Sequence, residues 1–103
     1  MTTATPNKTV LITGASSGIG LGLAEAYLAR GDNVVVNGRN EEKLNQAAKR
    51  LGHPDRVAVV AGDVADRDTG KRMVATALER FGSVDILVNN GGHFYAKAFT
   101  DYT

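Results

Sequence analysis

Four short runs of β-branched and aliphatic residues, separated by longer stretches, most constrain how this chain can fold. Each run has a continuous apolar centre, such as Val34-Val35-Val36, instead of apolar and polar residues in alternation. Strands that are covered on both faces show this pattern, and such strands belong to parallel sheets. We therefore predict four parallel strands, at Thr9 to Thr13, Asn33 to Asn37, Arg56 to Ala61 and Asp85 to Asn89.

Helical patterns occupy the stretches between the four runs. The first helix is predicted from about Ser17 to Arg30, because Gly31 provides a C-terminal stop. Its apolar face is expected at Ile19, Leu23 and Tyr27, which are spaced at i, i+4 and i+8.

Two more helices complete the alternation. The second follows Asn40 as N-cap and stops at Gly52. The third spans about Asp66 to Phe81, and its apolar face is expected at Met73, Val74, Ala77, Leu78 and Phe81. The order β-α-β-α-β-α-β predicts an α/β fold with a doubly wound parallel sheet, in strand order 3-2-1-4. Right-handed crossovers then place the first two helices on one face and the third helix on the other.

A glycine-rich segment, Thr13-Gly14-Ala15-Ser16-Ser17-Gly18-Ile19-Gly20, lies between the first strand and the first helix. A helix N-terminus offers unpaired N–H groups and a positive dipole end, which an anion satisfies. Glycines allow a sharp turn, a close backbone approach to a pyrophosphate and close packing of helix on strand. The expected cofactor-binding residues of this segment are Gly14, Ser16, Ser17, Gly18 and Ile19, with the pyrophosphate beside Gly18.

The spacing of this segment, T-G-x-x-x-G-x-G, resembles the fingerprint of the short-chain dehydrogenase/reductase family. The resemblance extends from about Lys8 to Gly92. It implies a Rossmann fold and an oxidoreductase that transfers hydride between a nicotinamide cofactor and an alcohol or carbonyl substrate. It also implies a parent protein that assembles as a homo-oligomer, a tetramer or a dimer.

The end of the second strand reads Asn37-Gly38-Arg39, without an acidic residue. In NAD-preferring Rossmann units an acid at this place binds the adenosine ribose hydroxyls. A carboxylate would repel a 2′-phosphate, whereas Asn37 is neutral and Arg39 offers a planar fork of donors. We therefore expect NADP(H) to be preferred over NAD(H), with Asn37 and Arg39 at the cofactor. The alternative is that Arg39 is a solvated surface charge.

The ends of the third and fourth strands carry the remaining cofactor candidates. Asp63 and Val64 match the family's Asp-Val pair, which implies contacts with the adenine; the alternative for Asp63 is a helix-initiating turn. Asn89-Asn90-Gly91-Gly92 resembles the family's Asn-Asn-Ala-Gly, with Gly91 in place of the usual alanine. Asn89 and Gly91 are expected beside the nucleoside, and the tail over residues 93–103 has no assigned element.

No candidate catalytic residue is found in the 103 residues. The family uses Tyr and Lys at i and i+4 on a helix, because the ammonium group lowers the pKa of the phenol. None of Tyr27, Tyr95 and Tyr102 is followed by lysine at that spacing. Tyr95 and Lys97 are two positions apart, so on a helix they would point in different directions. We expect the 103-residue chain to be catalytically inactive by itself and to be part of a larger domain.

Composition narrows the classes of partner. Twelve Lys and Arg against eleven Asp and Glu give a net charge of +1, which does not favour nucleic acid. The absence of cysteine, with only two histidines, predicts no metal site. The sequence shows no signal peptide and no membrane span. We expect a single cytoplasmic domain over residues 1–103, and a small-molecule substrate for the intact parent.

Two alternatives stay open. A standalone nucleotide-binding module would use the same glycine segment without catalysis. A fragment of an S-adenosylmethionine-dependent methyltransferase also has a glycine loop after its first strand, but it usually needs an acid at the end of the second.

Overall fold

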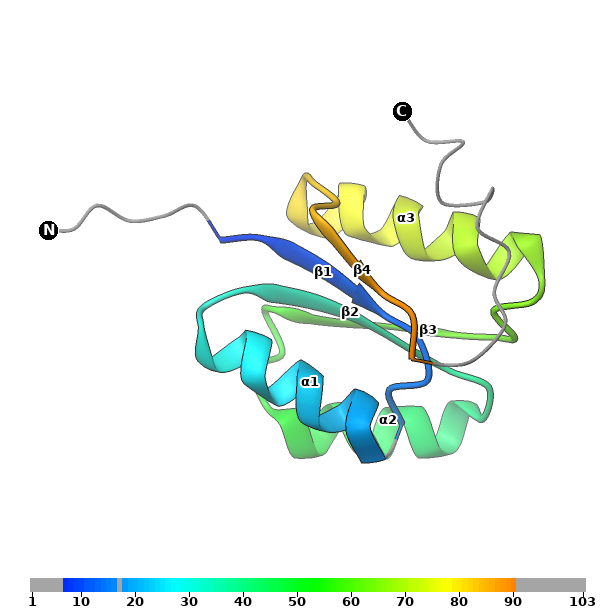
Figure 1. Cartoon of the computed structure of the whole chain (residues 1–103), viewed down its shortest axis with the longest axis horizontal. Coiled ribbons are helices and arrows are strands. Elements are labelled where there is room, and N and C mark those ends of the chain that lie inside the picture. The colour runs from blue at the N-terminus through cyan, green and yellow to red at the C-terminus, as the bar shows by residue number, and fades with distance from the viewer. Residues whose placement is uncertain (1–6, 17, 91–103) are drawn as a thin grey trace, which may run out of the picture.

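The strands and helices alternate along the chain as the sequence predicts. A computed structural model describes residues 7–16 and 18–90. The elements are β1 (Thr9–Ile12), α1 (Gly18–Ala29), β2 (Asn33–Gly38), α2 (Glu41–Leu51), β3 (Val57–Ala61), α3 (Arg67–Phe81) and β4 (Ile86–Val88) (Figure 1). Ser17, Gly91 and the 93–103 tail lie outside the described residues.

The four strands form one parallel sheet in the order β3-β2-β1-β4, which confirms the predicted topology. β1 occupies a central position, and its Leu11 lies in register with Val35 of β2 and Leu87 of β4. All four residues of β1 are buried. The continuous apolar run at the start of the chain is thus explained by burial on both faces of the sheet.

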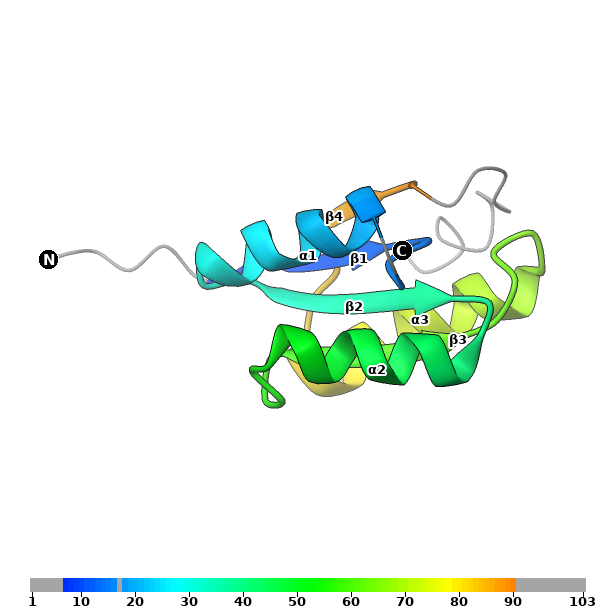
Figure 2. The same ribbon diagram turned by 90° about the horizontal axis from the view of Figure 1, so that it is seen from below.

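Helices cover the two faces of the sheet unequally, as Figures 1 and 2 show. α1 and α2 lie against one face, where they enclose Val10, Ile12, Val34 and Val36. α3 alone lies against the other face, where Leu11 and Val35 pack with helix residues that include Met73. This placement is the one that right-handed crossovers require.

Local signals fix the helix ends where the sequence predicts them. The side chain of Asn40 accepts a hydrogen bond from Lys43 N at 2.9 Å, which makes it the N-cap of α2. Asp66 caps α3 in the same manner through the N–H of Asp68, at 2.9 Å. Gly82 ends α3 in the left-handed conformation, with φ of 82°.

The predicted apolar face of α1 is wrong at Ile19, which is 75% exposed. Leu23 and Tyr27 are partly buried and pack against the edge of the core. The buried residues of α1 are Gly20, Leu21, Ala24 and Leu28. The helix packs on the sheet through two leucines and an alanine, and Gly20 lets its first turn come very close to the end of β1. Tertiary contact therefore overrides the side-chain pattern.

The predicted face of α3 is right except at Leu78, since Phe81 at its end packs against the core. Met73, Val74 and Ala77 are buried, whereas Leu78 is 44% exposed. α3 contacts β1, β2 and β3. Among the described residues no element covers the α3 side of β4, and Leu87 there is 37% exposed. This part of the sheet face is the bare apolar area that a single covering helix leaves.

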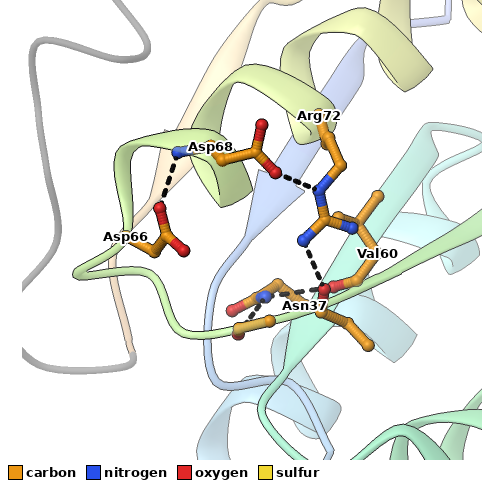
Figure 3. A network of polar contacts seen from close by, with 7 residues as sticks. Asn37, Val60, Asp66, Asp68 and Arg72 are labelled. Carbon is orange, nitrogen blue, oxygen red and sulfur yellow. Dashed lines mark hydrogen bonds and ion pairs between the residues drawn. The ribbon is translucent and has the colours of Figure 1, made fainter.

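The outer edge of β3 is closed by two arginines from α3. Arg80 Nη1 donates to Val57 O at 3.1 Å, and Arg72 Nη2 donates to Ala61 O at 2.9 Å. Asp68 accepts from Arg72 Nε at 2.9 Å and so orients its guanidinium (Figure 3). Unpaired carbonyls on a sheet edge invite pairing with another strand. The two arginines occupy those carbonyls and hold α3 against the edge.

Candidate functional site

The glycine segment forms a loop between the carboxyl end of β1 and the start of α1. Gly18 begins the helix with φ of +61°, a backbone conformation that residues other than glycine rarely adopt. A Cβ placed on Gly18 would meet no atom of the described residues within 4 Å, so among them the space in front of the helix terminus is open. Ile19 next to it is exposed. An open space beside orphan N–H groups suits the phosphates of a dinucleotide.

Gly20 serves a different purpose, which is close packing. A Cβ added to Gly20 would collide with Gly14 O and would lie 2.8 Å from Asn90 Nδ2 and 2.9 Å from Ala15 Cα. The loop and the first helical turn can approach this closely only because the side chain is absent. This geometry agrees with the close packing of helix on strand that the glycine segment predicts.

Side chains at the end of β4 tie that strand to the glycine loop. Asn90 Nδ2 donates to Gly14 O at 3.1 Å, and Asn90 N donates to Thr13 Oγ1 at 2.9 Å. Thr13 Oγ1 in turn donates to Asn89 Oδ1 at 3.2 Å. Thr13 is fully buried. The adjacent carboxyl ends of β1 and β4 thus form one hydrogen-bonded unit.

Sequence reasoning did not single out Thr13 or Asn90 as individual site residues. The sequence signal for Asn90 is the pair of asparagines at a strand end, because asparagine side chains commonly form hydrogen bonds with neighbouring backbone groups. Of the two, Asn89 is exposed beside the loop, whereas Asn90 is the one that fixes the loop itself.

Asn37 is buried inside the site and works as a structural bridge. Its Nδ2 donates to Val60 O and to Gly62 O, both at 3.0 Å, and Figure 3 shows the amide directed at the end of β3. Its Oδ1 lies 3.5 Å from Gly14 N, and its main-chain oxygen accepts from Ala15 N at 2.7 Å. Only 2% of Asn37 is exposed. The amide therefore joins the ends of β1, β2 and β3.

Arg39 and Asp63 follow the ends of β2 and β3 on the surface of the site. The side chain of Arg39 is 82% exposed, and its Nη2 lies 3.9 Å from Asp63 Oδ2. Asp63 Oδ1 accepts from Ala65 N at 2.9 Å, which closes a turn before α3. Val64 is buried behind it. Ser16 lies close to Gly38 at the end of β2, beside the same edge of the sheet.

The described candidates thus gather at the carboxyl edge of the sheet. Ligands of open parallel sheets bind at this edge, where the connections leave in opposite directions. Here the connection from β1 leads to α1 on one face, and the connection from β3 leads to α3 on the other. This is the arrangement of connections beside which open parallel sheets bind their ligands.

Comparison with known proteins places the chain in a family. The sequence profile described as short chain dehydrogenase matches residues 8–103. The chain belongs to the short-chain dehydrogenase family. A relative in Arabidopsis thaliana, named 11-beta-hydroxysteroid dehydrogenase-like 4A, is 48% identical over 99 residues, which are 93% of this chain and 33% of the relative. The short-chain dehydrogenase chain spans about a third of the length of the curated relatives that it matches.

Solved short-chain dehydrogenases share the fold. A crystal structure of a short chain dehydrogenase from Bacillus anthracis matches with a TM-score of 0.78 and 39% identity, over 84% of this chain and 35% of that one. The structure of L-sorbose reductase from Gluconobacter frateurii, in complex with NADPH and L-sorbose, matches with a TM-score of 0.77 and 40% identity. The match covers 84% of this chain and 34% of the reductase chain. The methyltransferase alternative gains no support from these matches.

One groove lies away from this site. A groove of about 620 Å³ between α2 and the start of β3 is lined by residues such as Ala48, Pro54 and Val57, none of them from the glycine loop. Within the described part of the chain, no His, Cys, Asp and Glu side chains gather in a group of three that could hold a metal ion. No helix in residues 7–16 and 18–90 has the length and apolar character needed to cross a membrane.

Proposed function

We propose that this chain is the NADP(H)-binding half of an oxidoreductase that acts on a small alcohol or carbonyl compound. The observation that carries the proposal is the open space in front of Gly18, at the N-terminus of α1 and the carboxyl edge of a parallel sheet. The cofactor supplies the hydride. This chain's residues bind and orient it, and no residue of the 103 is assigned a catalytic role.

The proposed binding residues follow the order of the strands. Gly14, Ser16, Ser17, Gly18 and Ile19 receive the phosphates, Asp63 and Val64 the adenine, and Asn89 and Gly91 the second nucleoside. Arg39 receives the 2′-phosphate, because it is exposed beside a strand end that carries no acid. Asn37 contributes by holding the strand ends together, since its amide is already bonded to Val60 O and Gly62 O.

The preference for NADP(H) is part of the proposal. It is supported by the exposure of the Arg39 side chain, which is 82%, and by the planar fork of donors with which a guanidinium binds phosphate. It is also supported by the NADPH bound to L-sorbose reductase, a protein of the same fold. We further propose that the complete protein is a homo-oligomer.

The test is equilibrium binding of NADPH and NADH to the complete polypeptide that the gene encodes, followed by assays with a panel of ketones and alcohols. Tighter binding of NADPH, with turnover of at least one carbonyl compound, is the expected result. Binding of NADPH without turnover of any substrate would favour the standalone nucleotide-binding module. A failure to bind either cofactor would contradict the proposal.

A further inference from the structure

Arg39 and Asp63 are brought together by the ends of two neighbouring strands. Gly62 N donates to Gly38 O at 3.0 Å, so the residues that follow these glycines leave the sheet side by side. The ion pair between them spans 3.9 Å, from Arg39 Nη2 to Asp63 Oδ2. Within the described ranges, Asp63 is the acid that Arg39 pairs with. The pair lies at the edge where the proposed function places the adenosine.

Asp63 is the fixed member of this pair and Arg39 the adjustable one. One carboxylate oxygen of Asp63 is held by Ala65 N at 2.9 Å, which leaves the other oxygen facing Arg39. The side chain of Arg39 is 82% exposed, against 51% for that of Asp63. An exposed guanidinium can leave one anion for another at small cost, because water screens the original pair.

We propose that Asp63 limits the selectivity for NADP(H) by competing with the 2′-phosphate for Arg39. The inference rests on the proposed function, because it assumes that this edge binds the adenosine. NADP(H) must draw Arg39 away from Asp63, whereas NAD(H) carries a hydroxyl group at the same position and does not need the guanidinium. The ion pair therefore weakens binding of one cofactor and leaves binding of the other unchanged.

This effect can be separated from a contact between Asp63 and the adenine. NADPH and NADH have the same adenine, so a lost adenine contact weakens both and cancels in the ratio of their dissociation constants. Asp63→Asn removes the charge, and its amide oxygen can still accept from Ala65 N. The ratio of the two dissociation constants thus reports the competition for Arg39 alone.

The experiment measures dissociation constants for NADPH and NADH in the complete polypeptide and in its Asp63→Asn, Arg39→Ala and doubly substituted forms. Asp66→Asn is the matched control, because Asp66 lies in the same connection and caps α3, a role that asparagine fills equally well. It removes the same charge near the site without touching the ion pair.

Asp63→Asn should raise the preference for NADPH over NADH about two- to fivefold, the range that exposed ion pairs span. The same substitution in the Arg39→Ala protein, and Asp66→Asn alone, should leave the preference unchanged. An unchanged ratio in Asp63→Asn overturns the inference, and so does an equal rise in the Arg39→Ala protein, which would mark Asp63 as a simple repelling charge.

The outcome also distinguishes this inference from the proposed function. If Arg39→Ala lowers the preference for NADPH while Asp63→Asn does not raise it, only the competition is wrong. If Arg39→Ala has no effect on the preference, the proposed role of Arg39 fails and the competition fails with it.

Discussion

The side-chain amide of Asn37 donates to Gly62 O at 3.0 Å, across 25 positions in the sequence. A second bond from the same nitrogen reaches Val60 O, also at 3.0 Å. Through these bonds the end of β2 sets the course of the chain after β3, where Asp63 and Val64 lie. The cofactor edge thus depends on a residue that has almost no exposed surface.

Asn37→Ala should lower the free energy of unfolding by about 2–3 kcal/mol, because two carbonyls lose their donor inside the protein. Cofactor binding should weaken for NADPH and NADH alike, since the amide is not available to either. Urea unfolding and titration with both cofactors measure the two effects. Asn45→Ala, on the surface of α2, is the control. A selective loss of NADPH binding would instead place Asn37 in direct contact with the 2′-phosphate.

Gly18→Val should abolish binding of both cofactors and leave most of the fold intact. The branched side chain would fill the open space in front of α1, and it would be strained at φ of +61°. Gly22→Val is the matched control, because Gly22 lies on the exposed side of the same helix, where no atom in the described part of the chain lies within 4 Å of its Cβ position. Circular dichroism and NADPH titration are the measurements. Undiminished binding in Gly18→Val would mean that the phosphates lie elsewhere.

Asp85→Asn should destabilise the protein at neutral pH and progressively less in acid. The hydrogen bonds from Thr9 N and Ser83 Oγ to the carboxylate lower the pKa of Asp85 below its usual 3.8. A carboxyl group whose pKa is lowered by folding stabilises the folded state at pH values above its pKa in the unfolded state. That contribution is lost as the pH falls through its pKa in the folded state.

Urea unfolding of Asp85→Asn and of the unaltered protein, from pH 7 to pH 3, tests this dependence. The difference in unfolding free energy should be largest at neutral pH and should shrink below about pH 4. Asp55→Asn, in the exposed connection before β3, is the control. A difference that stays constant over the whole range would show that the charge of Asp85 does not matter.

The 103-residue polypeptide expressed by itself should associate and should not reduce carbonyl compounds with NADPH. Leu87 and Leu78 are partly exposed at the α3 side of the sheet, and exposed apolar surface of this kind favours association with another molecule. General acid catalysis contributes about 10²- to 10⁴-fold, and no tyrosine and lysine share the required spacing.

Light scattering should give a mass above the 10.8 kDa of one chain. Leu87→Lys should lower that mass, whereas Val59→Lys on the other face of the sheet should not. A monomer that reduces a ketone would contradict both expectations and would direct attention to Tyr95, which lies outside the described residues.

The sequence predicts the fold well because its signals here are local. Asn40, Gly52, Asp66 and Gly82 act on their own helix ends, and continuous apolar runs mark the parallel strands, although β4 at the edge of the sheet is only partly buried. The inward face of α1 could not be predicted in this way. It depends on how closely Gly20 approaches Gly14, a contact that exists only after the loop has folded.

In the candidate site, too, the sequence predicts what depends on local signals and misses what depends on contacts between distant residues. The glycine segment has a spacing that identifies it, whereas the role of Asn37 depends on partners 23 and 25 positions away. Its position at a strand end suggested a cofactor contact, and only the hydrogen bonds show that the amide is engaged inside the protein. The pairing of Arg39 with Asp63 is likewise a consequence of strand order.

The most direct test of NADP(H) binding at this edge is the effect of Arg39→Ala on the dissociation constants of NADPH and NADH in the complete polypeptide. Binding of NADPH should weaken about 10- to 100-fold, the value of a charge-assisted phosphate contact, and binding of NADH should change little. Arg50→Ala, at the far end of α2, controls for the loss of one positive charge. Equal losses for both cofactors, or no loss for either, would contradict the assignment of this edge to NADP(H).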